Sequence, residues 1–136
     1  MPSSSAPFRI GTRGSPLALA QAHETRDRLG AAFNLPADAF EIVVIKTTGD
    51  DPTLINADIA LKTIGNKGLF TKEIEDALLG GKIDIAVHSM KDMPVAQPDG
   101  LLLDTYLPRE DVRDAFVSVG ALQLADIAAG ATIGSS

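Results

Sequence analysis

The residues best suited to chemistry in this sequence lie in the run Val87-His88-Ser89-Met90-Lys91-Asp92-Met93-Pro94. The run follows Lys82-Ile83-Asp84-Ile85-Ala86-Val87, a pattern typical of a strand. A lysine at the rim of a sheet can bind an anion, and an aspartate beside it can bind a cation or exchange a proton. From these residues alone, a solvated ion pair explains Lys91 and Asp92 equally well, and His88 fits a packed or capping role better than a catalytic one.

Two further loops combine a cation with a backbone that a ligand can approach. Arg13-Gly14-Ser15-Pro16 places Ser15 at a helix N-cap and Pro16 at the first helical position, so the helix end and the forked Arg13 suit a carboxylate or phosphate. Gly65-Asn66-Lys67-Gly68 offers flexible backbone and Lys67 as a counter-charge, without the spacing of a P-loop. The plainer interpretations are an ordinary helix cap and a flexible linker.

The elements that must position these loops follow from the apolar periodicity. Strands are predicted at 8–12, 40–46 and 83–87, and Ile42-Val43-Val44-Ile45 is typical of a strand buried on both faces. One helix is predicted from Ser15 to about Phe33, and the next carries an apolar face that ends at Gly80-Gly81. That face consists of Phe70, expected in the core, with Ile74, Ala77 and Leu78. Further on we expect strands at 101–107 and 115–119, a short helix at 122–128 and the start of a strand at 131–133.

The order strand–helix–strand–helix–strand predicts an open α/β sheet. Ligands of such sheets bind outside the carboxyl ends of the strands. Three polar loops are expected at those ends, at residues 13–15, 47–50 and 88–92. The sequence therefore predicts a ligand site there.

Composition excludes several classes of protein. The 136 residues, 45% hydrophobic and 22% charged, suit one domain with its own core. A net charge of −6 argues against a nucleic-acid surface but leaves room for a small basic pocket. Without cysteine and with only two histidines, the chain has no thiol nucleophile or disulfide, and no metal site is expected. Residues 1–7 are expected to form a disordered leader, and a cytoplasmic protein is the default.

Taken together, the motifs resemble the porphobilinogen deaminase family, whose members are also called hydroxymethylbilane synthases. The matching stretches follow the family's order and spacing over almost the whole chain. They are Arg9 to Leu19, Gly65 to Phe70, Asp84 to Pro94, and Arg109-Glu110-Asp111-Val112-Arg113-Asp114-Ala115-Phe116-Val117-Ser118.

The resemblance implies a transferase of tetrapyrrole and haem biosynthesis that joins four porphobilinogen molecules head to tail and releases ammonia at each step. It implies a dipyrromethane cofactor fixed to a cysteine that this chain lacks. Asp92 matches the catalytic aspartate, which is expected to hydrogen-bond pyrrole N–H groups and to stabilise the cationic azafulvene. The positions expected to bind carboxylates of cofactor and substrate are Arg13, Ser15, Lys67, Ser89 and Lys91. The implied fold is an open mixed α/β sheet with helices on both faces, like type II periplasmic binding proteins, here incomplete.

The chain departs from the family pattern in places. Thr63 stands where a lysine is frequent, Asn66 replaces a usual glycine, and Asp51 to Ala60 match weakly. Family members are much longer and have three domains, so we expect a fragment that ends early, at Ser136. The expected division is a leader at 1–7, a first α/β domain at 8–104, and a hinge with the opening of a second domain at 105–136. A full-length member is expected to be a monomer, whereas the fragment is expected to be inactive and prone to self-association.

Two rival functions remain open. One is a non-enzymatic organic-anion-binding module of the periplasmic-binding-protein fold, although Asp92 would then repel its ligand. The other is an interaction protein that pairs through exposed sheet surface.

Overall fold

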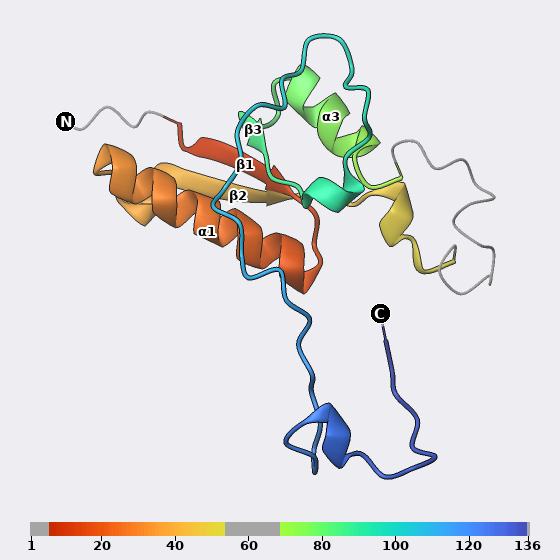
Figure 1. Cartoon of the computed structure of the whole chain (residues 1–136). Helices are drawn as coiled ribbons and strands as arrows, with labels where there is room; N and C mark the ends of the chain where they lie inside the picture. The colour runs from red at the N-terminus through yellow and green to blue at the C-terminus, as the bar shows by residue number, and fades with distance from the viewer. Residues whose placement is uncertain (1–5, 54–68, 136) are drawn as a thin grey trace. The chain divides into compact units, whose positions relative to one another are not determined.

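The computed structural model describes residues 6–53 and 69–135, and the chain divides into two compact units, Met1–Thr105 and Tyr106–Ser136. The sheet and both helices belong to the first unit (Figure 1). The helices and strands of the described residues are β1 (Phe8–Thr12), α1 (Pro16–Phe33), β2 (Phe40–Val44), α3 (Lys72–Leu79) and β3 (Ile85–Ala86). Single 3-10 turns are η1 (Ala37–Ala39), η2 (Thr48–Asp50), η4 (Met90–Asp92) and η5 (Leu124–Asp126).

The sheet has the order β2-β1-β3, with β1 in the centre and each described pairing parallel. Gly11 in β1 lies opposite Val43 on one side and Ala86 on the other. This arrangement confirms the predicted open α/β sheet. Because parallel strands end at the same edge, the loops that follow β1, β2 and β3 leave the sheet together.

Helix α1 begins and ends where its sequence predicts. The Ser15 hydroxyl accepts a hydrogen bond from the Ala18 N–H at 3.3 Å, and Pro16 occupies the first helical position. The helix ends at Asn34, whose left-handed φ of 54° lets its N–H donate to the Gly30 carbonyl. The predicted helix from Ser15 to about Phe33 is therefore confirmed.

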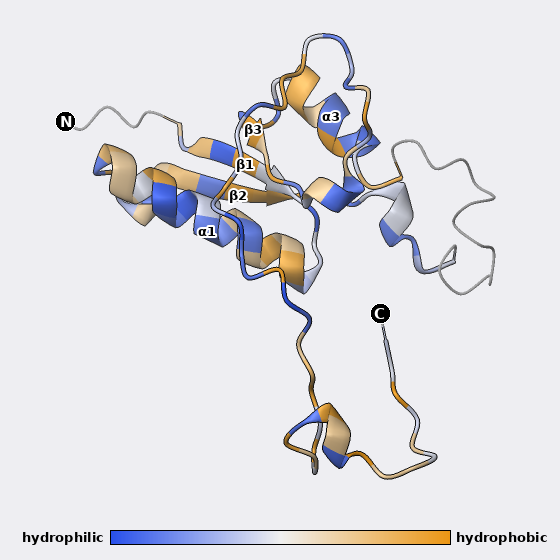
Figure 2. Cartoon of the chain, viewed as in Figure 1, coloured by the Kyte–Doolittle hydropathy of each residue, from blue (hydrophilic) through white to orange (hydrophobic). Residues whose placement is uncertain are grey.

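The two helices cover different strand pairs. Helix α1 packs against β1 and β2, and α3 packs against β1 and β3. Because the chain steps from β1 to β2 and then back across β1 to β3, right-handed connections place the two helices on opposite faces. Polar and apolar residues divide around α3, as expected of a helix with one face on a sheet (Figure 2).

The fully buried apolar side chains come from each layer: Ile10 of β1, Ala22 of α1, Ile74 of α3, and Ile83 just before β3. Gly11 allows the closest contact in this core. A β-carbon at Gly11 would lie 2.3 Å from Cδ1 of Ile83, so only glycine lets the Ile83 side chain pack across β1.

The second and third strands differ from their predictions. Val44 is 51% exposed, so the expectation that Ile42 to Ile45 would be buried on both faces is wrong: β2 is an edge strand of the described sheet. β3 is confined to two residues of the predicted 83–87 strand, although Asp84 and Val87 still donate backbone hydrogen bonds to Arg9 and Gly11 of β1.

In the second unit, described over residues 106–135, the only regular element is the 3-10 turn η5, where a short helix was predicted at 122–128. The strands predicted at 115–119 and 131–133, and the one at 101–107 that begins in the first unit, are not formed. A strand is stabilised by hydrogen bonds to a neighbour, and these segments have no paired strand among the described residues. Neither described helix has the length and apolar character that a membrane crossing requires.

Candidate functional site

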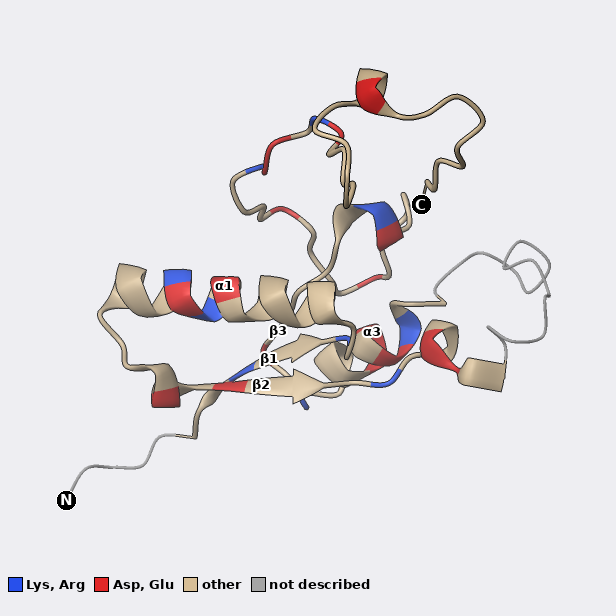
Figure 3. Ribbon diagram, turned by 90° about the horizontal axis from the view of Figure 1, so that it is seen from below, with Lys and Arg blue, Asp and Glu red and all other residues tan. Residues whose placement is uncertain are grey.

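A cavity of about 250 Å³ opens in the first unit where the loops leave β1 and β3. Its walls come from the end of the β1–α1 loop and the start of α1, from Phe70 two residues before α3, and from the segment after β3. The lining residues are Arg13, Ser15, Leu17, Ala18, Phe70, Val87, His88, Ser89, Lys91 and Asp92. Basic and acidic residues lie close together in the loops beyond the carboxyl ends of the strands (Figure 3). The cavity thus lies at the edge of the sheet where the sequence predicts a ligand site.

Arg13 links the loops that follow the three strands. Its Nη2 lies 2.5 Å from Oδ1 of Asp50, and its Nε donates to Oδ2 of Asp50 at 3.3 Å. Its Nη1 lies 3.5 Å from Oδ2 of Asp92, at the upper limit of a hydrogen bond. Arg13 therefore forms a two-pronged pair with Asp50 and only a long contact with Asp92.

The guanidinium of Arg13 also lies over an aromatic ring. Its Cζ is 4.0 Å from the ring centroid of Phe70, a cation–π distance. Phe70 is half-buried and lines the cavity, so the prediction that it belongs to the core is wrong. Gly49 makes room for the ring, because a β-carbon there would lie 2.2 Å from Cε1 of Phe70. The Gly49 N–H also donates to the Leu69 carbonyl at 2.7 Å, which fixes the chain just before the ring.

The pairing shifts the protonation equilibria of both charged partners. The hydrogen bond to Asp50 raises the pKa of Arg13, against the opposing effect of burial. The hydrogen bond from Arg13 lowers the pKa of Asp50, and the hydroxyl of Thr47, which donates to Oδ2 of Asp50 at 2.6 Å, lowers it further. Both groups therefore stay charged over the neutral pH range.

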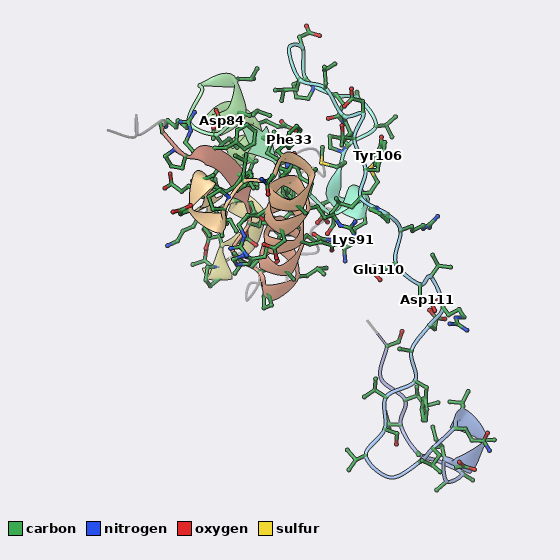
Figure 4. All side chains as sticks on the ribbon, turned by 90° about the vertical axis from the view of Figure 1, so that its left-hand side faces the viewer. Phe33, Asp84, Lys91, Tyr106, Glu110 and Asp111 are labelled. Carbon is green, nitrogen blue, oxygen red and sulfur yellow. The ribbon has the colours of Figure 1, made fainter. Side chains whose placement is uncertain are left out.

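The segment after β3 supplies four further residues to the cavity, of which Ser89, Lys91 and His88 are polar. The Ser89 hydroxyl donates to Oε1 of Gln21 on α1 at 3.0 Å, which ties this segment to the helix. Lys91 is exposed at the cavity rim (Figure 4). Burial lowers the pKa of His88, while Asp92 raises it and Arg13 lowers it. His88 is therefore a neutral group that can donate or accept a hydrogen bond in the cavity wall.

The structure brings together most of the residues singled out from the sequence. Arg13, Ser15, Ser89, Lys91 and Asp92 all line the one cavity, whereas Lys67 lies outside the described residues. Sequence reasoning missed Asp50 and the role of Phe70. The position of the 47–50 loop at a strand end was a signal for Asp50, but no sequence pattern indicates which of its side chains meets Arg13.

The arrangement can bind an anionic molecule and stabilise a positive charge within it. Arg13 and Lys91 can attract carboxylates, Ser15 and Ser89 offer hydroxyl groups, and Asp92 is a carboxylate that can accept N–H groups. Within residues 6–53 and 69–135, no cluster of three or more histidine, aspartate or glutamate side chains is placed to hold a metal ion.

Comparison with known proteins gives consistent results. Residues 8–136 match the family model described as porphobilinogen deaminase, dipyromethane cofactor binding domain. The chain is 67% identical over 136 residues to porphobilinogen deaminase of Paracoccus denitrificans (strain Pd 1222), which covers all of this chain and 42% of that protein. It is 62% identical over 131 residues to the chloroplastic porphobilinogen deaminase of Oryza sativa subsp. japonica, and 59% identical over 131 residues to that of Pisum sativum. These two matches cover 95% of this chain and 36% and 34% of the relatives, so the chain spans only about a third of their length.

Proposed function

This chain belongs to the porphobilinogen deaminase family, and from that premise we propose that it contributes to the head-to-tail condensation of porphobilinogen to hydroxymethylbilane with release of ammonia. The observation that supports this proposal best is the position of Asp92. Its carboxylate lines a cavity that also contains Arg13 and Lys91. Such a site suits a substrate that carries carboxylates and develops positive charge as it reacts.

The residues of the cavity fit the cofactor for which the matching family model is named. A dipyrromethane presents pyrrole N–H donors and carboxylate side chains. Asp92 is an acceptor for the N–H groups, and Arg13, Lys91, Ser15 and Ser89 are partners for the carboxylates. When bound, the group supplies the chain end to which pyrrole units are added. The 136 residues contain no cysteine, so a thioether anchor must come from elsewhere.

Asp92 is the catalytic residue of this proposal. As ammonia leaves porphobilinogen, positive charge spreads over the pyrrole, and a fixed carboxylate in contact with the ring stabilises that charge. The 3-10 turn η4 carries Asp92, and the hydrogen bond from Asp92 N–H to the Ser89 carbonyl at 3.0 Å closes this turn. This bond fixes the backbone from which the carboxylate extends before the charge develops.

The remaining candidate residues bind the carboxylates of cofactor and substrate in this proposal. Arg13 presents a guanidinium supported by Phe70, and Lys91 is an exposed cation of the cavity lining. Ser89 is positioned by Gln21, and Ser15 contributes its hydroxyl at the helix end. Lys67 keeps the same predicted role, although it lies outside the described residues.

The finer features of the fold belong to the same proposal. The order β2-β1-β3 with a site at the carboxyl ends supports a domain like those of type II periplasmic binding proteins, within a larger mixed sheet. The divisions 1–7, 8–104 and 105–136 remain the proposed domain boundaries, and a monomer remains the proposed state of a full-length member. The cytoplasmic location stays a prediction, since the rice and pea relatives are named as chloroplastic proteins.

The rival function, an anion-binding module without catalysis, is less well supported. The cavity lining places Asp92 beside Arg13, and Asp50 already occupies two nitrogens of that guanidinium. A receptor for a simple anion gains nothing from a second carboxylate next to its cation.

The proposal can be tested in a chimera, defined as the Paracoccus denitrificans relative with its matching region replaced by these 136 residues. The chimera is incubated with porphobilinogen, and the product is oxidised in acid and measured as uroporphyrin. We expect sustained porphyrin formation by the chimera and none above the uncatalysed blank by the 136-residue chain. A folded chimera without turnover would contradict the proposed function, and turnover by the chain alone would contradict the need for residues outside it.

A further inference from the structure

Asp50 holds Arg13 from outside the cavity. It accepts hydrogen bonds from Nη2 and Nε of Arg13 at 2.5 and 3.3 Å, yet it is not among the residues that line the cavity. Asp92 does line the cavity and meets the same guanidinium only through Nη1, at 3.5 Å. The two carboxylates therefore occupy different edges of one cation, and the edge that faces the cavity has the longer contact.

Asp50 is itself held by its own loop. Its Oδ2 accepts the hydroxyl of Thr47 at 2.6 Å, and its N–H donates to the Thr47 carbonyl at 3.0 Å. Thr47 is 5% exposed, so this anchor is buried. The ring of Phe70 supports the guanidinium from one face. Arg13 is thus restrained along one edge and one face, which fixes the direction in which Nη1 points.

We propose that Asp50 is a positioning residue that keeps Arg13 from neutralising Asp92. This inference rests on the proposed function, in which Asp92 must keep its negative charge for the cation that develops on the substrate. One guanidinium faces two carboxylates, so the group carries a net charge of −1, and that charge lies on Asp92 when Asp50 takes the short contacts. If Asp50 lost its charge, Arg13 would turn toward Asp92, and the close pair would be nearly neutral at the reacting centre.

This role predicts a separation of kinetic effects. In the chimera, we expect Asp50→Asn to lower kcat about tenfold or more while KM for porphobilinogen stays the same or falls. The reason is that the rate depends on the free charge of Asp92, whereas the cluster of Arg13, Asp50 and Asp92 loses one negative charge and so repels the substrate's carboxylates less. A purely structural role for Asp50 would instead raise KM and lower the thermal stability together with kcat.

Asp50→Glu and Asp84→Asn are the matched controls. Asp50→Glu keeps the charge and should recover most of kcat. Asp84 forms a similar two-pronged pair with Arg9 at the start of β3, outside the cavity, and Figure 4 shows it well apart from Lys91. Asp84→Asn should leave kcat and KM unchanged. Equal kcat losses for Asp84→Asn and Asp50→Asn would overturn the inference.

Crystal structures of the chimera and its Asp50→Asn variant supply a test that does not depend on activity. We expect the distance between Arg13 nitrogens and Asp92 oxygens to shorten from 3.5 Å to ordinary ion-pair length in the variant. An unchanged distance would overturn the inference even in an active chimera. An inactive parent chimera would contradict the proposed function, while the distance would still decide the role of Asp50.

A second variant applies if Asp50→Asn does not fold. Thr47→Val removes only the hydroxyl that anchors Asp50, and it should cause a smaller loss of kcat at constant KM. No loss of kcat would count against the inference.

Discussion

The ring of Phe70 supports the guanidinium of Arg13, whose Cζ lies 4.0 Å from the ring centroid. Phe70 lies in the turn two residues before α3, and Arg13 directly follows β1. This contact therefore joins two of the segments that line the cavity, and it makes the direction of one cation depend on the packing of an aromatic ring.

Replacing Asp92 tests the catalytic carboxylate. In the chimera, Asp92→Asn keeps the shape but removes the charge, so we expect the barrier to rise by about 2.7–4 kcal/mol, typical of a lost electrostatic partner. Asp92→Glu keeps the charge with altered geometry and should lose much less rate. Single-turnover rates with porphobilinogen measure both. Near-normal turnover by the asparagine variant would refute the assigned role.

Replacing Gly49 tests the space beneath the Phe70 ring. A β-carbon at Gly49 would lie 2.2 Å from Cε1 of Phe70, so Gly49→Ala must displace the ring and should destabilise the protein by about 1–3 kcal/mol. The midpoint of urea unfolding measures the change. Gly120→Ala is the matched control, because a β-carbon there has no neighbour within 4 Å. Equal midpoints for the two variants would show that the ring is not confined.

Ser15 has two separable roles, as a helix cap and as a cavity residue. Ser15→Ala removes the acceptor of the Ala18 N–H and should cost about 0.5–2 kcal/mol of stability. Ser15→Asp restores a capping oxygen but adds a negative charge to the cavity. We therefore expect Ser15→Asp to recover the unfolding midpoint and to raise KM for porphobilinogen. A Ser15→Asp variant with unchanged KM would show that no substrate carboxylate approaches this position.

His88 makes stability depend on pH. Burial lowers its pKa below the ordinary value of 6.5, so the unfolded chain binds the proton more readily than the folded one. The contribution of neutral His88 to the free energy of unfolding is fully present above about pH 6.5, and it is lost as the pH falls through the lower pKa of the folded state. Its charged neighbours Asp92 and Arg13 act in opposite directions.

We therefore expect His88→Gln to flatten the decline of the unfolding midpoint below about pH 6.5. His23→Gln, a change at the exposed histidine of α1, is the control and should leave the decline unchanged. A decline that persists in the His88 variant would mean that other groups cause it.

The sequence was sufficient for the elements whose signals are local. The Ser15-Pro16 start defines the beginning of α1, and the apolar run around Ile42 locates β2, because caps and periodicity act within a few residues. The strands expected at 101–107 and 115–119 are not formed, because a strand depends on a neighbouring strand that a local sequence pattern does not reveal.

The same limit applies to the site. Arg13 and Asp92 could be proposed from their loops and from the family resemblance, but the pairing of Arg13 with Asp50 and its contact with Phe70 could not. These contacts depend on side-chain packing between segments that are remote in the sequence. A cation placed over an aromatic ring leaves no periodic signal, and Phe70 has the same hydropathy whether it faces a core or a guanidinium.

The connections made by Arg13 also have a kinetic consequence. Asp50 and Asp92 lie 37 and 79 residues from Arg13 along the chain, whereas α1 needs only contacts between near neighbours. Closing long loops slows folding, so the helix can form well before the three strand ends meet. In pulse-labelled hydrogen exchange during refolding, amides of α1 should become protected before the Val87 amide, which donates to Gly11 of β1. The charge cluster would then be among the last parts of the molecule to assemble and among the first to be lost when the chain opens.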